Sequence, residues 1–460
     1  MNRTLGFKLG AIALLILLLL IPLAMIEGLV NERQYQREAV LQDIARSSSY
    51  RQQITGPILV LPYTRHWLEW KTHAKTGERY QEERQRRGRL YFLPETFVLN
   101  GQVDTEQRAR GIYKALLYRS DNQISGSFKL PANLGLGANL GQYRFDRPFL
   151  TVGISDIRGI SSDLKLQFNG ASLGFAPGSG DERFGTGVHA LLPALDSRGE
   201  QPLAFAFNLK LQGTEQLGIT PVGRDSRVEL SSDWPHPSFV GEYLPASREV
   251  SGSGFSALWQ TSFFATDMEQ VLQDCVTRNN CKGLGARHFG VSFVDPVDQY
   301  LKTERSIKYA LLFIGLTFAL FFLCEVLGRL AVHPVQYALV GMSLALFYLL
   351  LLSLSEHLGF ALAYGLAASA CVVLIGIYVS HVLHSALRGS AFAGLLGLLY
   401  ALLFGLLGAE DYALLLGSVL VFAVLAGFML LTRKLDWYSV GRSLGRGDAS
   451  SDQTGTGEQV

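Results

Sequence analysis

Long apolar runs lie at both ends of this chain, and a mixed stretch with charges and turns lies between them. Residues 9–26 are almost wholly apolar, which matches the roughly 20 residues that cross a bilayer as a helix. Short polar breaks divide the C-terminal third into apolar runs at 307–327, 334–355, 358–382, 391–407 and 412–432. The pattern predicts six transmembrane helices, an N-terminal anchor and a compact five-helix C-terminal bundle.

A cleaved signal peptide competes with the anchor, because both begin with a basic segment, here Arg3 and Lys8. The apolar run is long for a signal peptide. The sequence Leu23-Ala24-Met25-Ile26-Glu27 also lacks the spaced small residues that a signal peptidase needs. We therefore expect an uncleaved anchor.

Basic residues mark one set of helix ends, and acidic residues mark the other. The first set carries Arg3, Lys8, Arg329, Arg388, Arg433 and Lys434, whereas the opposite short loops carry Glu356, Glu410 and Asp411. The positive-inside rule then places both termini in the cytoplasm and residues 29–305 on the periplasmic side of the inner membrane. The tail at 435–460 is rich in Gly, Ser, Asp and Thr, which predicts disorder.

Residues 29–305 are predicted to form a separate domain that is large enough to bury its own core. Its first part, 30–50, has helical spacing of apolar residues. From Gly56 onward, apolar and polar residues alternate between turn residues, which indicates a β-sandwich or barrel. The clearest strands are 58–61, 89–93, 112–118, 164–168 and 203–211, with a helix at 267–276.

The predicted fold class is therefore α+β: a membrane protein with a β-rich, sandwich-like domain inserted between its first and second membrane helices. Its predicted divisions are the anchor at 1–28, the periplasmic domain at 29–305, the five-helix bundle at 306–434 and the tail at 435–460.

Charge and motifs exclude classes of function. With 41 Lys and Arg against 39 Asp and Glu, the chain gives no basis for nucleic-acid binding. No nucleophile, zinc or phosphate-loop spacing occurs, so we expect no catalytic residues, no cofactor and no metal. A membrane enzyme would have to use the loop residues Glu356, His357, Glu410 and Asp411.

Cys275 and Cys281 are the cysteines outside the apolar runs. In an oxidising periplasm they are expected to form a small-loop disulfide. A metal site is the alternative, although no histidine lies at a partnering distance in the sequence.

Three further features have a structural and a functional interpretation. The basic segment 79–89 is either a solvated hairpin tip or a dock for anionic lipid or wall polymer. An aromatic turn is either a packed corner or an interaction motif, and comprises Trp234, Pro235, His236, Pro237 and Phe239. Glu325, with Arg329 one turn on, is either an intramembrane ion pair or a functional carboxylate.

Three stretches resemble the CreD family of Gram-negative inner-membrane proteins, which are also described as cell envelope integrity proteins. They are SSDWPHPSFVG at 231–241, VSFVDPVDQYLKTERSI at 291–307 and TRKLDWY at 432–438. The resemblance covers nearly the full length. It implies a role in envelope integrity within the Cre two-component regulon, with no established catalytic mechanism.

The middle stretch leads straight from the predicted outer domain into the second membrane helix. Its candidate coupling residues are Asp295, Pro296, Asp298, Tyr300, Lys302, Glu304 and Arg305. We expect a non-enzymatic envelope protein whose partners are the lipid bilayer and envelope proteins, lipopolysaccharide or wall components. The alternatives are a transport component with a periplasmic substrate receptor, and a membrane enzyme that acts on lipid or wall precursors.

Overall fold

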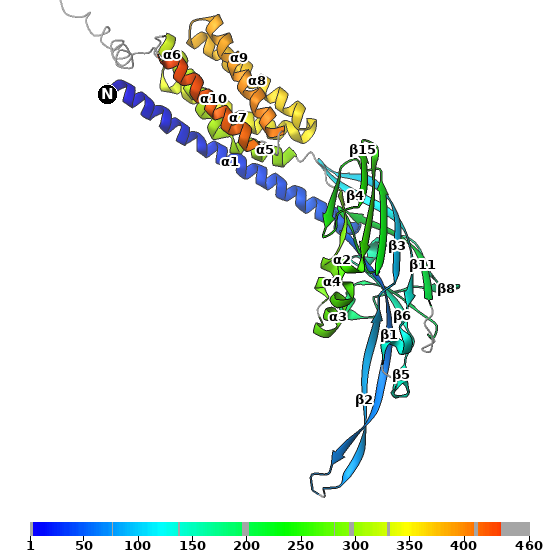
Figure 1. Ribbon diagram of the computed structural model, residues 1–460. Coiled ribbons are helices and arrows are strands. Elements are labelled where there is room, and N and C mark those ends of the chain that lie inside the picture. The colour runs from blue at the N-terminus through cyan, green and yellow to red at the C-terminus, as the bar shows by residue number, and fades with distance from the viewer. Residues whose placement is uncertain are drawn as a thin grey trace, which may run out of the picture. The chain divides into compact units, whose positions relative to one another are not determined.

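The computed structural model describes residues 3–75, 77–136, 139–195, 202–279, 281–293, 299–328, 332–408 and 413–433. The chain divides into two compact units (Figure 1). The helical unit comprises Met1–Glu38 and Val297–Val460, and the β-rich unit comprises Ala39–Pro296. The predicted tail at 435–460 lies outside the described residues.

The predicted apolar runs are helical where the structure describes them, apart from breaks at Tyr309 and Gly359. The anchor is part of α1 (Arg3–Ser47), a continuous helix of 45 residues that also includes most of the predicted helix at 30–50 and ends three residues before its predicted end. The C-terminal helices are α5 (Gln299–Lys308), α6 (Ala310–Gly328), α7 (Pro334–Leu358), α8 (Phe360–Val382), α9 (Ala386–Gly408) and α10 (Ala413–Thr432).

The start of α7 shows how local sequence sets these boundaries. The His333 side chain accepts a hydrogen bond from the backbone N–H of Val335, and Gln336 accepts one from the His333 backbone. Pro334 occupies the first turn, where a missing N–H costs nothing.

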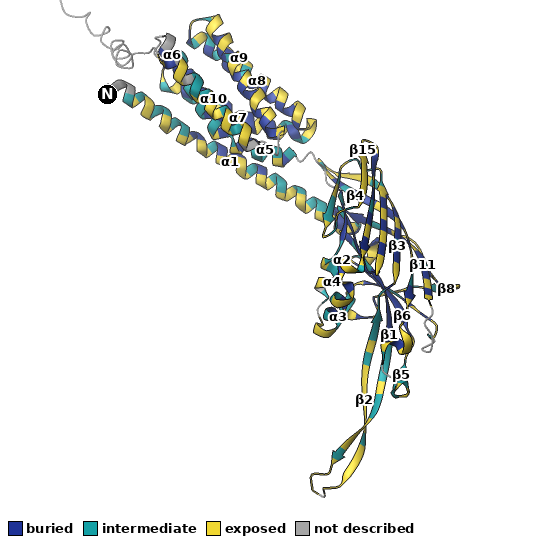
Figure 2. Ribbon diagram, in the orientation of Figure 1, coloured by how far each residue is buried: buried dark blue, intermediate teal, exposed yellow. Residues whose placement is uncertain are grey.

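Four of the described helices, α1, α7, α8 and α9, are long and apolar enough to cross a membrane. The pair α5–α6, bent by 47° at its junction, makes a fifth if the two count as one span. Outward positions of the helices carry exposed apolar side chains, among them Leu362, Val373 and Ile377 (Figure 2). Such surfaces are rare on soluble proteins and suit a lipid environment.

Within the helical unit, α1 buries one stripe of side chains, formed by Leu19, Leu23, Ile26 and Val30. Their spacing of three and four residues places them on one helix face. A Cβ atom at Gly341 of α7 would lie 2.4 Å from the Leu19 side chain, so this glycine permits close approach of the two helices.

The β-rich unit contains two sheets. The nine-stranded sheet has the order β14-β17-β12-β1-β6-β10-β9, and β2 and β5 also pair with β1. Its strands are β1 (Gln52–Thr72), β2 (Arg79–Phe92), β5 (Tyr143–Phe145), β6 (Phe149–Ile154), β9 (Ala176–Pro177), β10 (Gly187–Leu191), β12 (Gln216–Thr220), β14 (Pro237–Gly241) and β17 (Phe289–Phe293).

The eight-stranded sheet has the order β15-β16-β13-β3-β4-β11-β7-β8. Its strands are β3 (Thr96–Arg110), β4 (Tyr113–Lys129), β7 (Lys165–Phe168), β8 (Ala171–Gly174), β11 (Pro202–Thr214), β13 (Asp225–Ser232), β15 (Ser247–Ser251) and β16 (Gly254–Ser262). Each of the five strands predicted most clearly lies within, or overlaps, a strand of the structure.

Both sheets contribute to one hydrophobic core, as a sandwich-like arrangement requires. Trp259 of β16 is fully buried and stacks on Phe289 of β17, with 5.2 Å between the ring centroids. Three helices cover part of this unit: α2 (Phe263–Thr266), α3 (Met268–Arg278) and α4 (Lys282–Ala286). The protein is therefore α+β with a large β-rich domain.

Candidate functional site

A groove of about 810 Å³ lies between helix α3 and the end of strand β2. Its walls come from elements that are far apart in the sequence. They are residues 89–95, 129–131 and 222–224, together with Phe263, Thr266, Met268, Glu269, Leu272, Gln273, Val276 and Thr277.

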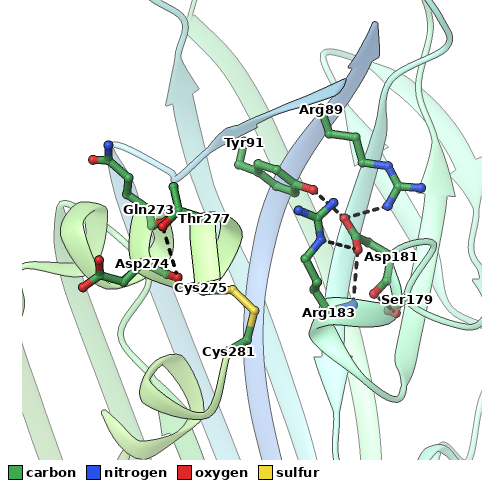
Figure 3. The surroundings of a disulfide bond; sticks show 10 residues. All are labelled: Arg89, Tyr91, Ser179, Asp181, Arg183, Gln273, Asp274, Cys275, Thr277 and Cys281. Atoms are coloured by element: carbon green, nitrogen blue, oxygen red, sulfur yellow. Dashed lines mark hydrogen bonds and ion pairs between the residues drawn. A yellow bond between two sulfur atoms is a disulfide. The ribbon is translucent and has the colours of Figure 1, made fainter. Parts of the chain in front are cut away.

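Helix α3 presents two different faces. Met268, Leu272 and Cys275 are buried in the core, which fixes the helix on the sheet. Glu269, Gln273 and Thr277 follow at intervals of four residues, so they form one stripe along the groove. Figure 3 shows Gln273 and Thr277 of this stripe on the helix beside Tyr91 of β2.

A disulfide joins Cys275 of α3 to Cys281, the residue before α4, with 4.3 Å between the Cα atoms (Figure 3). Cys275 is buried, so the bond connects the core side of α3 to the loop that follows it. Among the described residues, no group of three His, Cys, Asp or Glu side chains is placed to hold a metal ion. Whether the disulfide forms in the cell depends on the compartment, and that remains a prediction.

A buried carboxylate lies at the rim of the groove. Asp181, only 2% exposed, accepts hydrogen bonds from Arg89 at 2.7 Å, from Arg183 at 3.0 Å and from the Tyr91 hydroxyl at 2.6 Å (Figure 3). Burial by itself would raise the pKa of Asp181, but the hydrogen bonds from Tyr91, Arg89 and Arg183 outweigh it and hold that pKa below its usual value. Asp181 is therefore ionised and fixes both arginines.

Arg89 also lines a second cavity, of about 970 Å³, beside the loop that carries Asp181. Arg224, which also lines the groove, stacks over the Phe263 ring at 4.6 Å. It also pairs with Glu269 at 3.6 Å and with Glu95 at 4.0 Å. Ion pairs thus fix Arg89, Arg224 and Glu269 in the groove.

The chemistry of the groove is that of a binding surface. Its described lining mixes aromatic and aliphatic side chains with arginine, glutamine and threonine, and it includes no His, Cys or Ser. Ligand sites commonly combine apolar walls with a few fixed polar groups. The geometry can recognise a ligand of mixed polarity.

A second polar cluster lies within the helical unit. Glu325 of α6 is 1% exposed and pairs with Lys8 of α1. It also accepts hydrogen bonds from the Val332 backbone at 2.9 Å and from the Tyr337 hydroxyl at 2.8 Å. The cluster connects α1, α6 and α7. Arg329, the predicted partner of Glu325, lies outside the described residues.

The predicted coupling residues divide into two groups. Asp295, Pro296 and Asp298 lie outside the described residues. Tyr300, Lys302, Glu304 and Arg305 belong to α5. Tyr300 is buried and donates a hydrogen bond to Glu356. Lys302 lies over the Phe360 ring, and Glu304 pairs with Lys308. Four of the seven predicted coupling residues therefore lie in a helix of the helical unit.

The predicted aromatic motif forms a turn that leads into β14. The Trp234 indole donates a hydrogen bond to the His236 carbonyl at 2.9 Å, and Phe239 packs edge-on against Phe255 and Trp259. Pro235 lies in the turn and Pro237 begins the strand. These contacts describe a packed corner that does not line the groove, and a recognition role for it stays a prediction.

Comparison with known proteins identifies the family to which nearly the whole chain is similar. Residues 4–438 match the family described as "Inner membrane protein CreD". The chain belongs to the CreD family. It is 39% identical over 439 residues to the inner membrane protein CreD of Escherichia coli (strain K12). The aligned region covers 95% of this chain and 94% of that protein. Like the family, it is a membrane protein with several apolar helices.

The sequence does not single out Asp181 and Arg183, two residues of this CreD-family chain that line the second cavity and contact Arg89 and Tyr91 of the groove. A signal was present in the glycine-rich stretch around them. Gly178, Gly180 and Gly185 all have positive φ, a backbone conformation that favours glycine. Such a stretch marks a tightly folded loop, and loops of this kind often carry function.

Proposed function

We propose that this protein is a non-enzymatic inner-membrane component of envelope integrity, an effector of the Cre two-component regulon. In this proposal six helices cross the membrane, both termini are cytoplasmic and the β-rich unit lies in the periplasm. The one-sided distribution of Lys and Arg at the helix ends supports this orientation. The Cys275–Cys281 pair supports an oxidising compartment.

The observation that carries the proposal is the groove beside α3. Its walls are held by the core, the disulfide and the ion pairs of Asp181 and Arg224 before any ligand arrives. A preformed surface loses little entropy on binding, which suits recognition. The ligands that fit the proposal are envelope proteins, lipopolysaccharide or wall components, bound from the periplasm.

Filling the groove tests this role. We expect Gln273→Trp to abolish tolerance of an envelope-directed agent in a strain that lacks its own copy, because the indole occupies the space between α3 and β2. Abundance in the membrane and the oxidation state of Cys275 and Cys281 should stay unchanged. Survival and immunoblotting measure these outcomes.

Gln270→Trp is the matched control. Gln270 lies on the same helix and is exposed, but it does not line the groove. This variant should retain full tolerance. If Gln273→Trp also retains it at normal abundance, the groove is not the site through which the protein acts.

A further inference from the structure

The β1–β2 hairpin extends from the β-rich unit as a long arm (Figure 1). Its strands pair from Tyr63 opposite Gly88 to Thr72 opposite Arg79. Strand β5 covers the arm only at Tyr63–Arg65. Beyond that point the arm is a two-stranded ribbon, which is marginally stable in water without further contacts.

One face of the arm carries cross-strand ion pairs, with Tyr80 42% exposed beside them. Residues directly opposite each other in an antiparallel pair lie on the same face. On this face Glu69 pairs with Arg84 at 3.2 Å, Arg84 with Glu82 at 3.0 Å, and Glu82 with Lys71 at 2.6 Å. These contacts form a continuous ladder of ion pairs across the two strands.

The other face exposes large apolar side chains. Leu68 is 61% exposed and Trp70 is 63% exposed, at adjacent positions on this face. The register places Arg79 opposite Thr72 and Arg87 opposite Thr64, so an arginine lies on either side of the apolar pair. The same face carries Glu83, opposite Leu68, and its carboxylate contacts the His66 ring at 3.2 Å. We call Leu68, Trp70, Arg79 and Arg87 the arm face.

The arm as a whole is cationic. Between residues 65 and 88 the arm has seven arginines and lysines and four glutamates. The cations are Arg65, Lys71, Lys75, Arg79, Arg84, Arg86 and Arg87, and the anions are Glu69, Glu78, Glu82 and Glu83.

We propose that the arm face binds the surface of a bilayer that contains anionic phospholipid. Trp70 and Leu68 enter the headgroup region, where tryptophan is enriched in membrane proteins. Arg79 and Arg87 pair with the lipid phosphates, since basic residues near an anionic surface bind it electrostatically. A second copy is a poorer occupant, because an isologous contact would bring the arginines of both arm faces together. The inference is independent of the groove.

A fluorescent probe on the arm tests this in the full chain. Thr72→Cys, labelled with an environment-sensitive dye, places the probe beside Trp70, with Cys324 and Cys371 replaced by alanine. The protein is reconstituted in nanodiscs of phosphatidylcholine alone or mixed with phosphatidylglycerol, each with and without added vesicles of the same lipid. We expect the dye emission to shift to the blue only in samples that contain phosphatidylglycerol. The phosphatidylglycerol bilayer that the arm contacts is either that of the disc or that of the added vesicles.

Variants of the arm face separate its two contributions. Leu68→Ser with Trp70→Ser should raise the lipid concentration for half of the response about ten-fold or more, since two apolar side chains lose their burial. Arg79→Glu with Arg87→Glu should remove the preference for phosphatidylglycerol. Leu244→Ser, an exposed apolar residue off the arm, is the control and should change nothing.

Three results would overturn the proposal. The first is no response in either arrangement of the lipid. The second is an equal response with phosphatidylcholine alone. The third is a response that follows protein concentration without lipid, which would assign the arm face to contacts between copies.

Discussion

Replacing Lys8 with methionine is expected to lower both the amount of the protein in the membrane and its melting temperature in detergent. The substitution leaves Glu325, which is 1% exposed, without its cationic partner. Removing one member of a buried ion pair costs about 3–5 kcal/mol, because the remaining charge stays desolvated. The double variant Lys8→Met with Glu325→Gln should regain most of the loss. A glutamine keeps an acceptor for the Val332 backbone and can accommodate the Tyr337 hydroxyl.

Lys308→Met provides the comparison for this experiment. Lys308 pairs with Glu304, but its side chain is 61% exposed, so its loss should cost at most about 1 kcal/mol. Thermal unfolding and immunoblotting of membranes measure these three variants and the single variant Glu325→Gln. Suppose instead that Lys8→Met and Glu325→Gln both keep normal abundance and melting temperature but lose envelope tolerance. The cluster would then serve function rather than stability, as the transport interpretation requires.

The second large effect is expected at the segment between the two units. Replacing residues 295–298 with Gly-Ser-Gly-Ser should abolish envelope tolerance at normal abundance. We propose that this segment transmits load or ligand binding in the β-rich unit to the second membrane helix. A flexible linker would remove that transmission. Survival in the deletion strain and immunoblotting measure the outcome.

The structure limits the replacement to these four residues. Tyr300 and Thr303 of α5 are buried in the helical unit, so a linker that reached Arg305 would disturb folding as well. Glu-Pro-Ile-Glu at 295–298 keeps the charges and the proline, and it should retain tolerance. Full tolerance with Gly-Ser-Gly-Ser would show that the segment is only a connection.

Much of the fold can be predicted from local patterns in the sequence. Apolar runs long enough for a bilayer became helices, and alternating stretches such as 203–211 became strands, because both signals depend on neighbouring residues. The continuous helix α1 was predicted as two adjoining pieces. Its apolar anchor and its amphipathic extension have different patterns but the same backbone periodicity.

Contacts between distant residues could not be predicted in this way. Lys8 and Glu325 are 317 positions apart, and neither local sequence contains a pattern that identifies the other residue as its partner. The Asp181 cluster likewise forms because the loop after β9 contacts the end of β2. That contact depends on the order of the strands in the sheet rather than on local sequence. The basic segment 79–89 was recognised, but its cross-strand register, and hence the arm face, required the structure.

The side of the membrane on which the β-rich unit lies is the central claim, and cysteine labelling tests it most directly. Ser253→Cys places an exposed thiol in the β-rich unit, and Leu387→Cys places one beside Arg388, between α8 and the body of α9. Both are made with Cys324 and Cys371 replaced by alanine, and the parent without either added cysteine sets the background.

A membrane-impermeant maleimide is added to cells whose outer membrane alone is permeable, and again after the inner membrane is lysed. The account predicts that Ser253→Cys reacts before lysis and that Leu387→Cys reacts only after it. Labelling of Leu387→Cys in intact cells, with Ser253→Cys protected until lysis, would place the β-rich unit in the cytoplasm and contradict the account.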